Sequence, residues 1–361
     1  MTFSQLHSGR DEIILEPDMP IVDAGHHLFV RPALRYLLDD YLADVWAGHK
    51  VVGSVYIETN SFARIEGPEL MRPSGEIEFA NGMGAMSASG TFGDHRLCSA
   101  IVGHADLRLG DAVGGFLDSA LQRAPDRFRG IRQAANHHPS ELPYRYMPSR
   151  PPQGLLLDPL FRQGFRHLAT RGLSFDAGVF HHQLPELADL ADAFPETAII
   201  LGHCGLAVGM DMDANGRAEV FKQWRNGMQE IARRPNVLCK IGGFGLPFWG
   251  FGFENRSDPV GYEELAAAWG PYVQTATELF GPDRCMMESD YPVDSFSCGF
   301  VPLWNALKYI VRFASPAEKA SLFNGTAARV YRIHLPETHN HFVASPPEMG
   351  RGDNLKGNQI P

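Results

Sequence analysis

Hydrophobic residues follow two alternating patterns along the chain. Short runs that are apolar almost throughout, such as residues 51–57, are typical of parallel strands that are buried on both faces. Longer stretches with apolar residues three or four positions apart are typical of helices that bury one side. The two patterns follow each other from residue 21 to residue 331, so the sequence predicts a repeated strand-helix unit.

The alternation contains eight such units. Strands are predicted within residues 21–29 and at 51–58, 98–103, 128–133, 173–180, 197–201, 236–241 and 284–288. Helices are predicted at residues 31–46, 75–89, 111–123, 156–170, 183–194, 219–233, 262–280, 302–313 and 316–331. Strict alternation specifies a parallel sheet with helices outside it, and eight units favour an α/β fold of the (β/α)₈ TIM-barrel type. An open doubly wound sheet is the alternative, but no glycine-rich phosphate-binding turn follows the first strand.

The 361 residues are expected to form one domain, because barrels of this kind commonly reach such a length as a single unit. The catalytic barrel is predicted at residues 20–334. Residues 1–19 are polar and form a lead-in, and residues 335–361 lose apolar periodicity and are expected to be extended or disordered.

The formal net charge of -10, with no block of basic residues, argues against nucleic acid and an anionic membrane surface as partners. A small-molecule substrate is therefore expected, and homo-oligomer formation is left open. The five cysteines have no metal-like or disulfide-like spacing, which indicates free thiols in a reducing compartment. No signal-like or membrane-spanning run is present in the sequence, so a soluble cytoplasmic protein is expected.

Polar residues stand at the ends of several predicted strands. In a TIM barrel the reactive groups lie at the carboxyl ends of the strands, where the following loops form the mouth. His27, His181, His203 and Asp290 follow strands one, five, six and eight, and we expect them to share one site. Further candidates at the same end are His26, Glu58, His104, Arg132 and Lys240, with Trp249 in the aromatic loop at 242–253.

The motifs in this order resemble the amidohydrolase superfamily, within it the branch of sugar-acid lactonases and 2-pyrone-4,6-dicarboxylate lactonase. The superfamily pattern is His-x-His after strand one, one histidine after each of strands five and six, and an aspartate after strand eight. Here these positions hold Gly25-His26-His27, His181, His203 and Asp290. The strings HQLPEL at 182–187 and ESDYPVD at 288–294 are also similar, and the resemblance covers residues 20–333.

Gly25 stands where the first histidine of that pattern is expected, and it has no side chain to bind a metal. The resembling pyrone lactonases imply that hydrolysis proceeds without a metal, so no cofactor is favoured. The alternative is a single divalent metal, Zn²⁺, held by His27, His181 and Asp290.

The resemblance implies a hydrolase that opens a lactone or related cyclic ester. Asp290 would be the general base toward water, provided that burial or a neighbour raises its pKa. His27, His181 and His203 would polarise the carbonyl group and stabilise the oxyanion.

Other candidates are assigned to the substrate. Arg132, and less surely Arg129 or Arg64, would pair with a substrate carboxylate, with Lys240 as another anion anchor. Glu58, Trp249 and His26 complete the predicted substrate contacts. Three alternatives stay open. A structural role is favoured for His26 and His104. Arg132 would otherwise pair with Glu58 or Asp106, and Trp249 would only pack against other residues of its loop.

Two other functions compete with lactone hydrolysis. Related barrels decarboxylate aromatic or unsaturated acids without oxidation by using a bound divalent metal, and Gly25 weakens this alternative. The second competing function is a barrel that binds a small molecule without catalysis. Asp290 argues against it, because a site that has lost catalysis has no need of a carboxylate at the end of strand eight.

Overall fold

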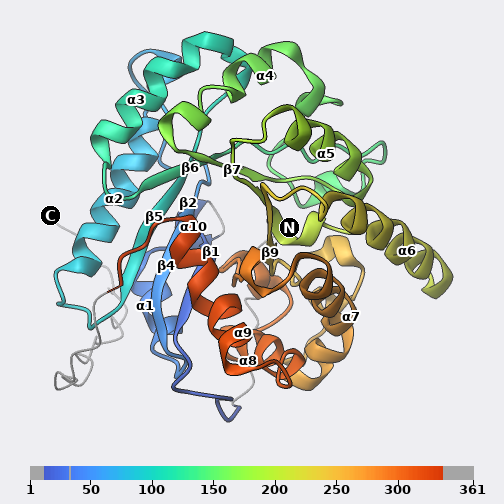
Figure 1. Cartoon of the computed structure of the whole chain (residues 1–361). Helices are drawn as coiled ribbons and strands as arrows, with labels where there is room; N and C mark the ends of the chain where they lie inside the picture. The colour runs from blue at the N-terminus through green and yellow to red at the C-terminus, as the bar shows by residue number, and fades with distance from the viewer. Residues whose placement is uncertain (1–11, 32–33, 336–361) are drawn as a thin grey trace, which may run out of the picture.

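The computed structural model describes residues 12–31 and 34–335. The first eleven residues of the predicted lead-in and the predicted tail from residue 336 lie outside this part of the chain. The predicted (β/α)₈ barrel is confirmed: eight parallel strands form a nearly closed barrel, and helices surround it (Figure 1).

Each barrel strand pairs in parallel with its neighbour, in the order β1-β4-β5-β6-β7-β8-β9-β10. The strands are β1 (Ile21–His26), β4 (Val51–Ile57), β5 (Arg96–His104), β6 (Phe128–Arg132), β7 (Ser174–Ala177), β8 (Ile199–Leu201), β9 (Val237–Ile241) and β10 (Cys285–Met287).

The first and last strands meet just beyond their carboxyl ends. His26 forms a parallel bridge with Tyr291, and the amide N–H of Asp290 donates to the carbonyl oxygen of Gly25 at 2.9 Å. Asp23 adds a side-chain link, because its carboxylate accepts hydrogen bonds from both the amide and the hydroxyl of Ser289. These contacts hold His27 beside Asp290.

Alternate residues of the strands fill the inside of the barrel, as the two-residue period of a strand requires. A buried inner cluster contains Val22 and Ala24 of β1, Val55 and Ile57 of β4, Ala100 and Val102 of β5, Ile200, Leu238 and Met286. Tyr331 and Ile333, which follow α10, belong to the same cluster. They therefore close the amino-terminal end of the barrel, and Figure 1 shows α10 in front of the strands on that side.

The remaining strand residues pack outward against the helices in a larger buried cluster. The helices are α1 (Leu38–Val45), α2 (Ser74–Ala88), α3 (Val113–Arg123), α4 (Pro159–Phe165), α5 (Leu184–Ala193), α6 (Ala214–Ile231), α7 (Tyr262–Phe280), α8 (Phe300–Ile310), α9 (Pro316–Ala320) and α10 (Thr326–Val330). Among the described residues, no helix is long and apolar enough to cross a membrane.

The helix predicted at residues 31–46 is partly wrong. Only α1 is helical, and the preceding residues form an antiparallel pair, β2 (Phe29–Arg31) and β3 (Leu34–Tyr36). Leu34 and Tyr36 are buried while Arg35 between them is exposed, so the segment has the period of a strand as well as of a helix. The helix begins after Leu37, whose amide N–H donates to the carboxylate of Asp40 at 2.8 Å.

Other differences concern boundaries. Helix α6 begins at Ala214, five residues before its predicted start, because the side chain of Asp213 accepts from the amide of Gly216 and caps the helix. Strand β7 ends at Ala177, three residues before its predicted end. His181 therefore follows a short irregular segment rather than the strand itself.

Candidate active site

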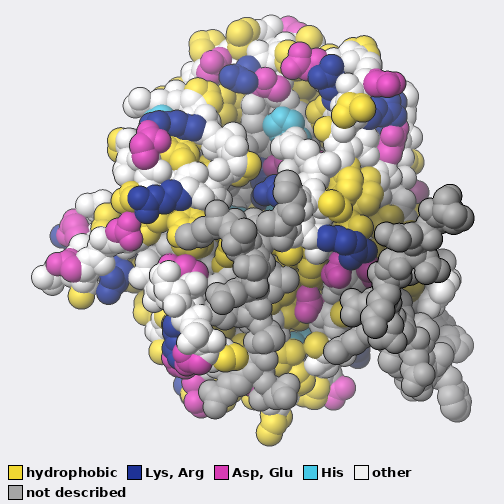
Figure 2. All heavy atoms as spheres, turned by 180° about the vertical axis from the view of Figure 1, so that it is seen from behind, with side chains coloured by type: hydrophobic (Ala, Val, Ile, Leu, Met, Phe, Trp, Pro, Cys, Tyr) yellow, Lys and Arg dark blue, Asp and Glu magenta, His cyan; other side chains and the backbone are white. Residues whose placement is uncertain are grey.

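A small cavity opens at the carboxyl ends of the strands. Figure 2 shows this face of the molecule, with a hollow in which basic and acidic side chains lie. The charged residues that line the cavity are Arg132, His203, Lys240, Asp176, Glu288 and Asp290. Six ionisable groups from five different strand ends in one small space are typical of a functional site rather than a packed core.

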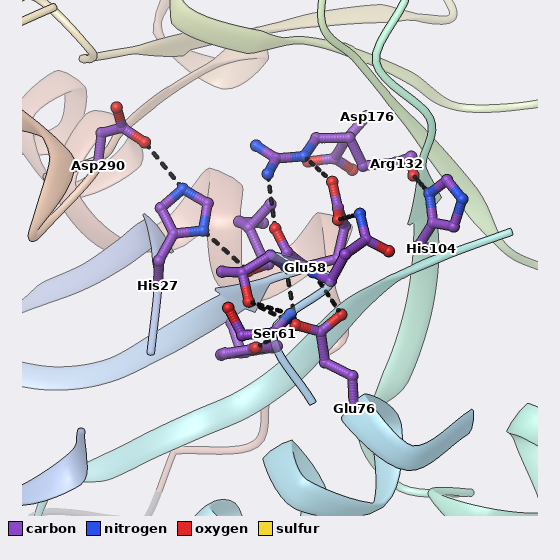
Figure 3. Close-up of polar contacts among 12 residues, drawn as sticks. His27, Glu58, Ser61, Glu76, His104, Arg132, Asp176 and Asp290 are labelled. Atoms are coloured by element: carbon purple, nitrogen blue, oxygen red, sulfur yellow. Dashed lines mark hydrogen bonds and ion pairs between the residues drawn. The ribbon is translucent and has the colours of Figure 1, made fainter. Parts of the chain in front are cut away.

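His27 and Asp290 are in direct contact. His27 Nε2 lies 3.1 Å from Asp290 Oδ1, and His27 Nδ1 lies 2.9 Å from the carbonyl oxygen of Ile57. Figure 3 shows the imidazole between these two acceptors. Both side chains are buried, so the contact is shielded from water.

His203 lies on the other side of the same carboxylate. Its Nδ1 is 2.7 Å from Glu288 Oε1, and its Nε2 is 3.8 Å from Asp290 Oδ1. Burial lowers the pKa of His203, but the carboxylates of Asp290 and Glu288 outweigh this effect and raise the pKa to about 9. His203 is therefore an imidazolium at neutral pH.

The backbone at this point is strained. His203 has a φ of 48° and Asp290 a φ of 53°, both in the left-handed region that residues with a side chain rarely adopt. Such a conformation costs on the order of 1 kcal/mol per residue and is concentrated at functional sites. Gly243 makes room for the ring, since a Cβ atom there would lie 2.4 Å from His203 Nδ1.

Lys240 of β9 supplies a buried ammonium group. Its Nζ lies 2.8 Å from Asp176 Oδ2 on β7 and 3.8 Å from Glu288 Oε2. The hydroxyl of Tyr331 donates to the same oxygen of Asp176 at 2.7 Å. Lys240, Glu288, His203 and Asp290 thus form one continuous chain of alternating charges.

Arg132 of β6 pairs with Glu58. The guanidinium Nε donates to Glu58 Oε1 at 2.8 Å, and Nη2 donates to the Glu58 carbonyl oxygen at 2.6 Å (Figure 3). Burial raises the pKa of Glu58, but the charge and hydrogen bond of Arg132 together with the nearby His104 and His27 outweigh burial and lower the pKa. Glu76 holds this loop in place by accepting from the amide and hydroxyl of Thr59.

The pKa of Asp290 does not move in the direction that its predicted role requires. Burial raises the pKa, but the charge of His203, the hydrogen bond from His27 and the charge of Arg132 lower it below its ordinary value. In the free protein Asp290 is therefore an ionised acceptor and a weak base.

His181 is not one of the residues that line the cavity. It begins a 3₁₀ turn at His181–Gln183, and its Nδ1 accepts a hydrogen bond from the amide of Val208 at 3.3 Å. Burial and the neighbouring His182 lower the pKa of His181 to about 4, so the ring is neutral.

Three further candidate residues from the sequence contact other groups of the protein. His26 stacks on Tyr41 of α1, with ring centroids 4.0 Å apart, so it faces the helix layer. The indole of Trp249 is buried and donates to the carbonyl oxygen of Gly243 at 2.8 Å. His104 Nδ1 lies 3.3 Å from the carbonyl oxygen of Arg132.

The two other arginines have partners elsewhere. Arg64 forms an exposed ion pair with Glu78, and Arg129 donates to the carbonyl oxygen of Tyr331 at 3.1 Å. Neither lines the cavity.

Asp176 and Glu288 had no assigned role in the sequence analysis. Both are buried carboxylates. Each stands in or directly after a short apolar strand, between residues that are themselves core-forming. A charge in such a run must be paired when it is buried, and this is the signal that would have identified them.

The described residues do not fit a divalent metal. Among them, no group of three or more His, Cys, Asp or Glu side chains is arranged to hold a metal ion. Of the three predicted ligands, His27 and Asp290 are in direct contact, whereas Nδ1 of His181 accepts a hydrogen bond from the Val208 amide. Two protein ligands are one fewer than the three of a catalytic zinc site.

The parallel barrel, with charged residues at the carboxyl ends of its strands, places the chain among TIM-barrel proteins with a site at the barrel mouth. The chain belongs to the amidohydrolase family, whose model (Amidohydro_2) matches residues 22–333.

Two relatives are similar over most of the chain. The uncharacterized protein y4mH of Sinorhizobium fredii is 35% identical over 301 residues, which cover 82% of this chain and 86% of that protein. L-fucono-1,5-lactonase of Burkholderia ambifaria is 28% identical over 247 residues, which cover 67% of this chain and 73% of that protein.

Solved structures support the fold. An amidohydrolase of Burkholderia multivorans, solved with bound zinc, has a TM-score of 0.67 at 20% identity and covers 87% of this chain and 99% of its own. A putative 2-pyrone-4,6-dicarboxylic acid hydrolase of Pseudomonas putida has a TM-score of 0.59 at 15% identity and covers 88% and 99%. At these identities the likeness concerns the barrel alone.

Proposed function

We propose that the chain hydrolyses a lactone or related cyclic ester of a small, carboxylate-bearing compound. The observation that carries the proposal is the position of the Asp290 carboxylate between His27 Nε2 and His203 Nε2, beside the cavity. The similarity to an L-fucono-1,5-lactonase supports the same reaction class.

In the proposed reaction a water molecule attacks the lactone carbonyl carbon and transfers its proton to Asp290. The negative charge that develops on the carbonyl oxygen is stabilised by the imidazolium of His203, in a site shielded from water. His27, whose ring nitrogens face Asp290 and the Ile57 carbonyl, positions the Asp290 carboxylate. The ring C–O bond then breaks, and the leaving alkoxide takes the proton from Asp290. The product is a hydroxy acid that ionises, so one proton is released per turnover at neutral pH.

The lowered pKa of Asp290 is compatible with this role once substrate is bound. The groups that lower it are His203, His27 and Arg132. A substrate carboxylate at Arg132 and an oxyanion at His203 would neutralise their effect on Asp290. Asp290 therefore becomes more basic as the reaction proceeds.

A panel of lactones and esters tests the proposal by proton release, with and without a chelator. The panel contains L-fucono-1,5-lactone, other sugar-acid lactones and lactones that carry a carboxylate. We expect turnover of a carboxylate-bearing lactone, and Asp290→Asn should reduce it by about 10²-fold to 10⁴-fold. The matched control is Asp118→Asn on α3, where the aspartate is exposed and pairs with Arg171.

The same assay separates the competing functions. Non-oxidative decarboxylation of a carboxylate consumes a proton, so the pH change has the opposite sign. A protein that only binds small molecules gives no pH change with any compound. Unchanged turnover in Asp290→Asn would show that the assigned base is wrong.

A further inference from the structure

Lys240 is a buried cation at the floor of the cavity. Its side chain is 3% exposed and reaches two carboxylates, Asp176 Oδ2 at 2.8 Å and Glu288 Oε2 at 3.8 Å. The ammonium group also lies 5.3 Å from the ring centroid of Tyr331. An ammonium group is retained in such surroundings only when it is paired, and here strands β7 and β10 supply the pairs.

Gly25 lies directly beside this ion pair. A Cβ atom at Gly25 would be 2.4 Å from Glu288 Oε2 and 3.5 Å from Lys240 Nζ. The space into which a side chain at this position would project is therefore already occupied by a carboxylate and an ammonium group. A metal ligand at position 25 would therefore require Glu288 to move away from its present position.

Glu288 links Lys240 to His203 and, through His203, to Asp290. One oxygen of Glu288 faces Lys240, and the other lies 2.7 Å from His203 Nδ1. The same histidine points its Nε2 toward Asp290. Lys240 thus fixes Glu288, and Glu288 fixes the ring of His203 against Asp290.

We propose that the ammonium group of Lys240 is the fixed cation of this site and takes the place of a divalent metal ion. A second cation close to Lys240 would be repelled, since the repulsion between buried like charges is only weakly screened. Lys240 is a positioning residue, because it acts on the reacting groups through Glu288. The effect of Lys240 on turnover rests on the proposed function, in which the His203 ring held by Glu288 stabilises the oxyanion.

Metal content tests the proposal without substrate. The full chain is stripped with a chelator, dialysed against Zn²⁺ or Mn²⁺, and analysed for metal per chain. We expect the wild type to hold much less than one ion. The double variant Gly25→His/Lys240→Met should bind one ion per chain, because it removes the cation and supplies a ligand next to His27 and Asp290.

The matched control is Lys222→Met, which removes an exposed lysine on α6 and should leave metal content unchanged. One tightly bound ion per wild-type chain, lost in Asp290→Asn, would overturn the proposal. It would also be overturned if the double variant melts cooperatively yet binds no more metal than the wild type.

Lys240→Arg keeps the charge and provides a second measurement where the double variant does not fold. This variant should remain without metal. If it binds one ion per chain, the charge of Lys240 does not exclude the metal. None of these measurements uses turnover, so a lactone panel without activity would reject the proposed function and leave this inference standing.

Discussion

His27 directs both of its ring nitrogens at oxygen acceptors: Nε2 lies 3.1 Å from Asp290 Oδ1, and Nδ1 lies 2.9 Å from the carbonyl oxygen of Ile57. A carbonyl oxygen only accepts, so Nδ1 carries a proton. The contact with Asp290 is then a hydrogen bond only if a second proton lies between Nε2 and the carboxylate. The pair is thus built to hold one exchangeable proton beside the cavity.

His27→Gln tests this arrangement. Glutamine keeps a donor but cannot hold the second proton, so we expect kcat/KM for the accepted lactone to fall by about 10²-fold. Steady-state kinetics measure the change. His167→Gln, which alters a histidine paired with Asp111 on the outer helices, should have wild-type kinetics. A His27→Gln enzyme with full activity would contradict a catalytic role for the pair.

Glu288→Gln tests the charge of His203. Because Glu288 and Asp290 together raise the pKa of His203 to about 9, a neutral amide at position 288 should lower that pKa. The alkaline limb of the pH profile of kcat/KM, where the imidazolium loses its proton, should move to lower pH. NMR titration of the His203 ring gives the same shift independently.

The control for this prediction is Glu219→Gln on the exposed side of α6, which should leave both the pH profile and the titration unchanged. If the His203 titration stays near pH 9 in Glu288→Gln, the charge of Glu288 does not control it.

Part of this site was predictable because barrel geometry places every strand end at one mouth. His27, His203 and Asp290 each follow an apolar run, and the closure of β1 on β10 brings the first and last of them together. The ion pairs of Lys240 with Asp176 and Glu288 were not predictable in the same way. Asp176 and Glu288 obtain their roles from Lys240 on a third strand, and such a pairing depends on the shear of the barrel.

His181 and His26 show what a sequence pattern does not determine about side-chain position. A pattern locates the end of a strand to within a few residues, but it does not show which way the chain turns there. Strand β7 ends at Ala177, so His181 stands in the 3₁₀ turn that follows and not at the predicted strand end. A single step in strand register decides which face a side chain occupies, and it places His26 on the helix side and His27 at the mouth.

Arg132→Lys tests the predicted substrate anchor. The guanidinium has enough donors to hold Glu58 and also reach the cavity, whereas an ammonium group cannot serve both. We expect KM for a carboxylate-bearing lactone to rise about tenfold, with KM for a neutral lactone unchanged. The matched control is Arg64→Lys, whose arginine pairs with Glu78 at the surface. An equal effect on charged and neutral lactones would argue against a carboxylate contact.

Asp23 gives a prediction about stability and pH. It is buried where β1 meets Ser289, and burial outweighs its hydrogen bonds and raises its pKa from 3.8 to about 6. The folded protein therefore binds this proton more tightly than the unfolded chain does. The resulting stabilisation is fully present below about pH 4 and is lost as the pH rises through 6; it amounts to about 3 kcal/mol.

Urea unfolding of the wild type and of Asp23→Asn between pH 4 and pH 7 measures this effect. Asparagine does not titrate, so the free energy of unfolding of the wild type minus that of the variant should fall by about 2 kcal/mol across the range. Asp118→Asn should show little change with pH over this range, because the hydrogen bond from Arg171 lowers the pKa of Asp118 and its contribution is lost only as the pH falls below about 4. A difference between wild type and Asp23→Asn that does not vary with pH would mean that Asp23 closes the barrel as a carboxylate throughout.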